Sequence, residues 1–318
     1  MAEAVTSYLR KVVKGEIFTL AAILVLLMAV MAVITHGATL SASNLRNILI
    51  QSSIRGVAAV GEAFVLLTAG IDVSVGGVAV FLGVIGAVLM GQAAFPIALA
   101  LLVMLLLGAS IGSFSGFCVS HIRMNPLVVT LALWIIAPGA AYLFTHGTTL
   151  SDLPRSLSFL GLGDILTIPM PVIIFGMMAV LAHLVLSDTT FGRAVYATGT
   201  NEMAARLSGI RTTQTKFLVY AISGFYAGVS AIIIISRIMC ASNTMISGLE
   251  LDAIASCVIG GVSLMGGKGS VAGLIIGVLI IGVVNNSLRL MGVTPALVPI
   301  AKGGIILLAV MIDALRRR

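Results

Sequence analysis

The sequence is poor in charge. Charged side chains make up 9% of its 318 residues, whereas hydrophobic ones make up 59%, and the mean hydropathy is +1.19. A soluble globular domain carries about 25% charged residues, which keep its surface solvated. This shortage of charged residues excludes a soluble globular domain. We therefore expect an all-α polytopic membrane protein that forms a single transmembrane domain over residues 1–318.

Cysteine and histidine are also scarce and scattered. The three cysteines are Cys118, Cys240 and Cys257, and the four histidines are His36, His121, His146 and His183. Their spacing matches neither a set of metal ligands nor a disulfide framework. No metal site is expected, and the cysteines are interpreted as core residues.

Nucleotide-binding and catalytic motifs are missing as well, despite three partial matches. A GxGxxA match at 267–272 has no βαβ unit around it, and Lys268 is followed by Gly269 where a phosphate-binding loop needs Ser or Thr. A GxSxG match at 108–112 lies inside an apolar span, where with Gly116 it predicts close helix packing. No catalytic residue, cofactor or nucleic-acid partner is expected, and the net charge of +7 is assigned to contacts with anionic lipid.

Long apolar runs, in contrast, fill the chain. Divided by polar or glycine-rich breaks, they predict ten transmembrane helices. The spans cover residues 17–35, 55–70, 74–93, 96–120, 126–145, 170–187, 217–239, 250–265, 270–288 and 297–313. The first run has the length of a full span and lacks a small-residue cleavage site, so it is interpreted as a retained helix rather than a signal peptide.

Basic residues are divided unequally by this topology. On the inner side fall Arg10, Lys11, Lys14, Arg123, Arg193, Arg206, Arg211, Lys216, Lys268, Arg316, Arg317 and Arg318, and outside or within spans fall Arg46, Arg55, Arg155, Arg237, Arg289 and Lys302. An excess of Lys and Arg marks cytoplasmic loops. Both termini and segment 191–216 are therefore predicted to be cytoplasmic. Segments 36–55 and 146–170 are predicted to be periplasmic, the first with a short interfacial helix after a cap at Ser43.

Segment 191–216, FGRAVYATGTNEMAARLSGIRTTQTK, is the longest polar interruption. It predicts a short helix over 201–208. The signals are a cap at Thr200 or Asn201, an acid in the first turn at Glu202, a base in the last turn at Arg206 and a left-handed position at Gly209.

This short helix needs a partner. Met203 and Leu207 are four residues apart and share one face, with Ala204 and Ala205 beside them. A helix of two turns is not stable alone in water. Two interpretations stay open on physical grounds: a docking surface for another protein, and an amphipathic connector lying on the membrane surface.

Several motifs in one order resemble a known family. They are FGRxVYAxGxNExAARLSGI in segment 191–216, GIDVSVGG at 70–77, NPLVVTLA at 125–132 and ELDAIASCVIGGVSLMGGKGSVAG within 249–313. From about residue 44 onward the chain resembles the permease subunits of bacterial ABC sugar importers of the ribose type. Two positions depart from that pattern: Thr200 replaces a glycine, and Pro138 replaces an arginine.

The resemblance implies a non-enzymatic permease of the inner membrane that works by alternating access. Its implied partners are a cytoplasmic ATP-binding subunit, a periplasmic sugar-binding protein and a second permease copy or paralogue. Helix 201–208 would be the coupling helix, with Asn201, Glu202, Ala204, Ala205, Arg206, Leu207, Ser208 and Gly209 against the ATP-binding subunit. Two signature turns are also implied, one with Gly70, Asp72, Ser74 and Gly76 and one with Gly266, Gly267, Lys268 and Gly269. Substrate-binding residues are not identified.

Each signature turn has two interpretations. The favoured one is a tight cytoplasmic hairpin, with Asp72 as N-cap of the span that begins at Ser74, and the other is a pair of helix ends aimed into the membrane. Charged residues within spans are few: Glu62, Arg237, Asp252 and Lys302. Their small number disfavours a self-sufficient secondary carrier. That carrier, and an ABC permease for branched-chain amino acids or nucleosides, are the alternative functions.

Overall fold

The protein is a bundle of helices in the computed structural model, which describes residues 2–93 and 95–294 and the single positions 297, 300, 303, 304 and 307. The elements in chain order are α1 (Ala2–Ile34), η1 (Ala38–Leu40), α2 (Ala42–Leu67), α3 (Val75–Ala87), η2 (Val88–Gln92), α4 (Ile97–Ser120), α5 (Pro126–Thr145), η3 (Arg155–Leu157), α6 (Ser158–Leu162), β1 (Asp164–Ile165), β2 (Ile168–Pro169), α7 (Met170–Asp188), α8 (Thr190–Thr200), α9 (Glu202–Leu207), α10 (Thr212–Ile238), α11 (Leu249–Ile259) and α12 (Val271–Leu290). The expected all-α fold is confirmed.

Within the described residues, eight helices are long and apolar enough to cross a membrane. They are α1, α2, α3 with η2, α4, α5, α7, α10 and α12, and they match eight of the ten predicted spans. The predicted span 250–265 holds only α11, whose 11 residues rise about 16 Å, roughly half of a bilayer core of about 30 Å. The predicted span 297–313 falls on residues that, apart from five single positions, the structure does not describe.

Helix α2 corrects the prediction of a separate interfacial helix within 36–55. Its N-cap is Ser41 and not Ser43, because the Ser41 side chain accepts the backbone N–H of Asn44. From there α2 runs unbroken to Leu67. Most of the segment 36–55, which was predicted to be periplasmic with a short interfacial helix, is thus the first half of a spanning helix.

Two polar residues of this part of α2, Asn44 and Arg55, are paired inside the bundle. Arg55 Nε lies 2.7 Å from Asp252 Oδ2 on α11, and the side-chain amides of Asn44 and Asn286 on α12 exchange hydrogen bonds of 2.9 and 2.8 Å. An intramembrane charge or amide is tolerated where it has such a partner. For this reason the prediction that Arg55 marks the start of a span was wrong.

Helices α4 and α10 form the closest pair in the bundle, and they meet through the predicted glycine stripe. A Cβ atom at Gly108, Gly112 or Gly116 would come within 2.4, 2.2 or 2.6 Å of a backbone oxygen of α10. From the other side, a Cβ at Gly224 would come within 2.1 Å of the Gly108 oxygen. In a membrane, small residues at an interface let backbones approach and gain packing energy. The predicted role of the stripe in close packing is confirmed.

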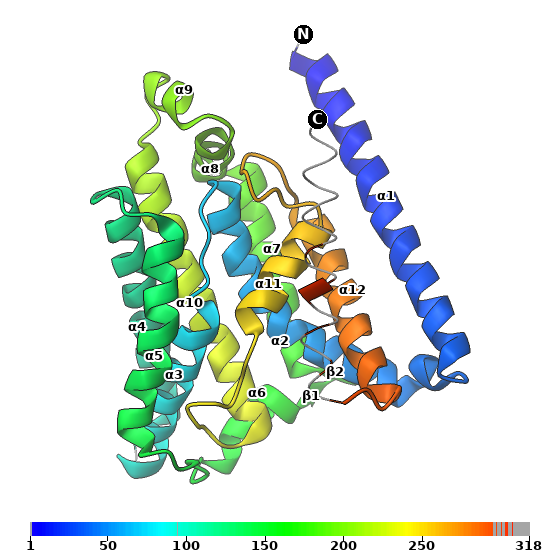
Figure 1. Ribbon diagram of the computed structural model, residues 1–318, viewed down its shortest axis with the longest axis vertical. Helices are drawn as coiled ribbons and strands as arrows, with labels where there is room; N and C mark the ends of the chain where they lie inside the picture. Colours follow the sequence, from blue (N-terminus) through cyan, green and yellow to red (C-terminus); the bar gives the residue numbers. More distant parts are fainter. Residues whose placement is uncertain are drawn as a thin grey trace.

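Two connections enter the bundle instead of turning at its surface. After α2, residues 68–74 run back inward before α3 begins, and after α10, residues 240–248 run inward from the opposite end to the start of α11 (Figure 1). In Figure 1 the connection at 68–74 is the blue-to-cyan stretch near the top, and the connection at 240–248 is yellow. Helices α8 and α9 lie at the same end of the molecule as the start of α1, and the β1–β2 hairpin lies at the other (Figure 1). The bundle therefore contains two helices, α3 and α11, that begin inside it.

The α4–α10 contact gives a stability prediction. Gly112→Ala should destabilise the fold by about 1–3 kcal/mol, because the added methyl group overlaps the backbone of α10. Gly176→Ala on α7 is the matched control, since a Cβ there meets nothing within 4 Å. It should be neutral or stabilise by about 0.5–1 kcal/mol, because Gly is costly inside a helix. Thermal unfolding in detergent measures both, and equal unfolding temperatures for the two variants would contradict this packing.

Candidate functional site

Helix α9 is built as the sequence predicts. Asn201 is its N-cap, and the Asn201 side-chain oxygen accepts the backbone N–H of Ala204 at 3.0 Å. At the other end, Gly209 has a φ of +83°, and the N–H of Ile210 donates to the carbonyl of Ala205 at 3.0 Å. Both ends of the helix are closed by local hydrogen bonds, so its length is set by its own sequence.

Glu202 ties α9 to the start of α10. Its carboxylate accepts hydrogen bonds from Lys216 Nζ on α10, from Arg206 at 3.2 Å and from the Thr212 hydroxyl at 3.4 Å. Partial burial favours the neutral acid, but the hydrogen bond and charge of Lys216 and the charge of Arg206 outweigh it and lower the pKa of Glu202. The short helix is thereby anchored to a long central one.

The two faces of α9 differ in burial. Ala205 is buried against the protein, whereas Met203 is 64% exposed and Leu207 is 83% exposed. Ala204, Arg206 and Ser208 are also exposed. The face that the sequence predicts as apolar therefore points away from the chain, and the helix stays in place through Glu202 and Ala205.

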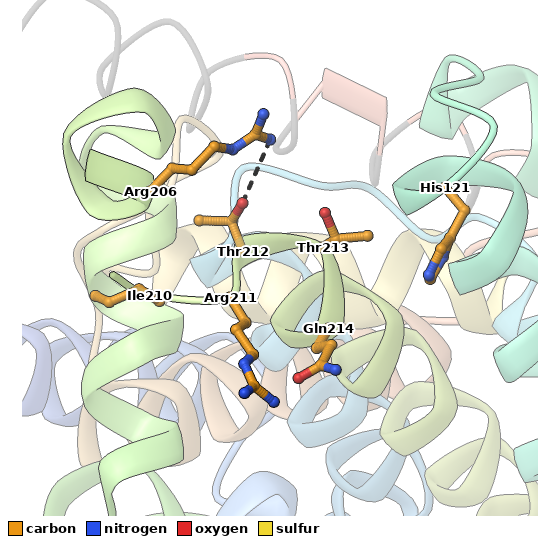
Figure 2. A pocket seen from close by; sticks show the side chains of 7 residues that line it. All are labelled: His121, Arg206, Ile210, Arg211, Thr212, Thr213 and Gln214. Atoms are coloured by element: carbon orange, nitrogen blue, oxygen red, sulfur yellow. Dashed lines mark hydrogen bonds between the residues drawn. The ribbon is translucent and has the colours of Figure 1, made fainter. Parts of the chain in front are cut away.

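An open cleft of about 520 Å³ adjoins α9. Its lining residues are His121, Arg206, Ile210, Arg211, Thr212, Thr213 and Gln214. Figure 2 shows Arg206 reaching from α9 toward Thr212, with His121 from the end of α4 on the far side of the cleft. The lining residues include two arginines and no acid, so the cleft favours an acidic or hydroxyl-bearing surface.

The second signature turn, residues 266–269, packs directly beneath α8. The N–H of Gly267 donates to the carbonyl of Leu67 at the end of α2 (3.0 Å), and Tyr196 of α8 donates its hydroxyl to the carbonyl of Gly269 (3.0 Å). A Cβ at Gly199 would lie 1.8 Å from the Leu67 oxygen and 2.6 Å from the Gly267 nitrogen. This turn therefore joins α8, α2 and α11, while Lys268 itself is exposed.

In the first signature turn, Asp72 is placed differently from the prediction. Ser74, not Asp72, occupies the N-cap position of α3, and Asp72 is buried. Its carboxylate accepts the Ser74 N–H at 3.0 Å and the Ser223 hydroxyl of α10 at 2.8 Å. The N–H of Asp72 in turn donates to Glu62 at 3.2 Å. The tight surface hairpin was a wrong prediction, because this polar backbone lies inside the bundle, where α2 and α10 supply its partners.

Sequence reasoning missed the long-range partners of these residues. Arg55 pairs with Asp252 across 197 positions, and Ser223 meets Asp72 across 151. A polar residue on an apolar helix is the available signal, but it does not name the partner. Lys302, one of the charged residues predicted to lie within spans, lies outside the described residues.

An apolar helical bundle with paired charges inside, two helices that start within it and an anchored short helix at one end defines a multi-pass transport permease. Over residues 44–315 the chain matches the family described as branched-chain amino acid transport system / permease component. The chain belongs to this family of ABC transporter permeases and is a multi-pass protein of the bacterial inner membrane.

Named relatives and a solved structure are similar over most of the chain. The ribose import permease protein RbsC of Haemophilus influenzae is 40% identical, with 91% of this chain and 90% of the relative covered. RbsC of Escherichia coli K12 is 38% identical (90% and 92% covered), and the xylose transport system permease protein XylH of Haemophilus influenzae is 31% identical (97% and 98% covered). A metal-chelate type ABC transporter in an inward-facing conformation has a TM-score of 0.52 at 16% identity, covering 95% of this chain and 96% of that one. That last likeness concerns the fold alone.

The anchoring of α9 predicts a pH dependence. Because the pKa of Glu202 is lowered in the folded protein, the tie to Lys216 is complete above the ordinary Glu pKa of about 4.3 and is lost as the pH falls through the lowered value. Hydrogen-exchange protection factors of α9, corrected for the intrinsic rate at each pH, should stay constant from neutral pH to about 5 and drop below the ordinary pKa. Glu202→Gln should show low protection at neutral pH and no such drop, whereas identical profiles for the two proteins would contradict the anchoring.

Proposed function

We propose that this chain is the membrane-spanning subunit of an ATP-driven importer for a sugar or sugar-like polyol. Sugars are favoured over branched-chain amino acids because the similar relatives are named for ribose and xylose. Pentoses are therefore the first candidates. ATP hydrolysis belongs to a separate cytoplasmic subunit, and a periplasmic sugar-binding protein delivers the substrate.

The observation that carries the proposal is the exposed apolar face of an anchored helix. Leu207 and Met203 point outward from α9, and Glu202 holds α9 against Lys216 of α10. Large exposed apolar side chains with charges around them are typical of protein-binding surfaces. The adjoining cleft, with Arg206 and Arg211, complements acidic groups on the partner. We assign this surface to the cytoplasmic ATP-binding subunit.

The mechanism is alternating access driven through this contact. Closure of two ATP-binding subunits around ATP would displace α9, and α9 can transmit the displacement because Glu202 and Ala205 fix it to the bundle. Rigid-body movement of packed elements is a common way to switch a protein between two states. A second permease copy or paralogue completes the path in this assembly.

Docking through α9 is tested by assembly. Leu207→Glu places a charge on the exposed apolar face and should abolish co-purification of the ATP-binding subunit, because an unpaired charge in an interface costs several kcal/mol, on the order of 2–5. Leu166→Glu is the matched control: Leu166 is 90% exposed and connects β1 and β2 at the other end of the molecule. It should retain the subunit. Undiminished co-purification with Leu207→Glu would contradict the assignment.

The substrate class is tested by uptake in cells that carry or lack this permease. Loss of pentose uptake that follows ATP depletion, and not collapse of the proton gradient, is the expected result. Uptake driven by the proton gradient would instead indicate a secondary carrier. Loss of leucine uptake alone would indicate an amino-acid permease.

A further inference from the structure

Segment 240–248 crosses part of the bundle without forming a helix. It enters from the far end of α10 and leads to the start of α11 (Figure 1). Four of its side chains are polar, namely Ser242, Asn243, Thr244 and Ser247, and the last two are exposed. Non-helical backbone at membrane depth is tolerated only where it is buried in protein or lines a water-filled cavity. An exposed polar segment in this position therefore faces water and not lipid.

Helices α3, α5 and α11 meet where this segment ends, and two glycines at the start of α3 permit the contact. A Cβ at Gly76 would lie 1.9 Å from Oε2 of Glu250 on α11. A Cβ at Gly77 would lie 2.8 Å from the backbone oxygen of Trp134 on α5. A larger residue at Gly77 would push α3 away from α5, and one at Gly76 would displace the Glu250 carboxylate. The glycine pair that ends the motif GIDVSVGG thus brings Glu250 and Trp134 to one place.

Glu250 is a buried acid at this junction, and the hydrogen-bond donors close to its carboxylate are neutral groups. Its side chain belongs to a residue that is 5% exposed, at the first turn of a helix that begins inside the bundle. Its carboxylate lies against Gly76 of α3, and the Trp134 indole and the backbone N–H groups of Gly248 and Glu250 are neutral donors close to it. Ionisable groups within a membrane protein are costly and mark substrate paths. Asp252, two residues later, differs because Arg55 neutralises it.

Trp134 gives the junction an open aromatic surface. It is the single tryptophan of the chain, and 40% of it is exposed. Small-molecule sites combine apolar or aromatic walls with a few well-placed polar groups. A sugar offers both matching surfaces, since its C–H faces lie flat on an aromatic ring and its hydroxyls donate to a carboxylate.

We propose that Trp134 and Glu250 form a sugar-binding station on the translocation path, at the junction of α3, α5 and α11. The proposal rests on the function proposed above and adds the contact residues. Glu250 accepts the substrate's hydroxyl groups, and the exposed ring of Trp134 packs against the sugar. Thr244 and Ser247 supply further hydroxyl groups along the approach from the α10 side.

Tryptophan fluorescence tests binding directly, because Trp134 is the single tryptophan of the chain and selective excitation of tryptophan reports on this position. In a detergent without a sugar headgroup, D-ribose or D-xylose should change this emission in a saturable way, and L-leucine should not. Glu250→Gln keeps the shape of the side chain but removes its charge, and it should weaken the effect by about tenfold, the size of one hydrogen bond to a charged group. An emission that no pentose changes would overturn the proposal.

Transport by the full importer separates this proposal from the function on which it rests. Glu250→Gln and Trp134→Leu should each raise the KM for pentose uptake, or lower its maximal rate, by about tenfold, with the ATP-binding subunit still co-purifying. Phe144→Leu is the matched control, because it removes another exposed aromatic from α5. It should leave uptake unchanged.

Three outcomes of the transport experiment are informative. Wild-type pentose uptake that both site variants impair, with the Phe144 control intact, supports the station. Wild-type uptake that neither site variant impairs overturns the station and leaves the proposed function standing. No ATP-dependent uptake of any pentose, hexose or polyol by the wild-type importer overturns the proposed function and the station with it.

Discussion

Close contact between helices at glycine positions is the constraint on which this structure depends. Gly108, Gly112 and Gly116 let α4 lie against α10, and Gly76 and Gly77 let α3 meet α11 and α5. In lipid there is little hydrophobic drive to bring apolar helices together, so close packing and internal hydrogen bonds supply the stability. The polar groups that enter the bundle, such as Asp72 and Arg55, accordingly find their partners on neighbouring helices.

The same kind of contact connects the surface around α8 and α9 with the interior of the bundle. Gly199 of α8 lies against the turn at 266–269, and Tyr196 donates to that turn. The turn follows α11, whose first residues include Glu250. A displacement of α9 would thus pass through α8 and the turn to α11. Helix α5, which carries Trp134, packs instead on α3 and α4. If α8, the turn and α11 follow α9, these elements move relative to α5, and the station lies on the boundary between them.

Local features could be predicted from the sequence, and partners could not. The ends of α9 follow from Asn201 and Gly209 because capping and a positive φ depend on adjacent residues. The stripe at 108–116 predicts a close helix contact but not that α10 makes it. Asp72 was assigned to capping since its spacing to Ser74 fits that role, whereas its hydrogen bonds to Ser223 and Glu62 come from distant segments.

Two kinds of signal were underused. The predicted span began too late, at residue 55, because a charged residue usually marks the end of a span. The ion pair with Asp252 explains why Arg55 lies inside α2 instead. The proximity of Trp134 and Glu250 was not predicted. The sequence does show that Trp134 is the single tryptophan and that Glu250 follows a polar break between two spans. Their proximity depends on Gly76 and Gly77, and on a fold that local periodicity does not specify.

The most direct test of the account is a set of distances between spin labels in the reconstituted importer. Labels at Arg193 on α8, Met265 beside the turn and Ile135 on α5 are suitable because all three residues are exposed, with the native cysteines replaced and labelled permease diluted with unlabelled chains. On addition of ATP, the account predicts that the distances from Ile135 to Arg193 and to Met265 change while the distance from Arg193 to Met265 stays constant. A change between Arg193 and Met265, with Met265 fixed relative to Ile135, would contradict it.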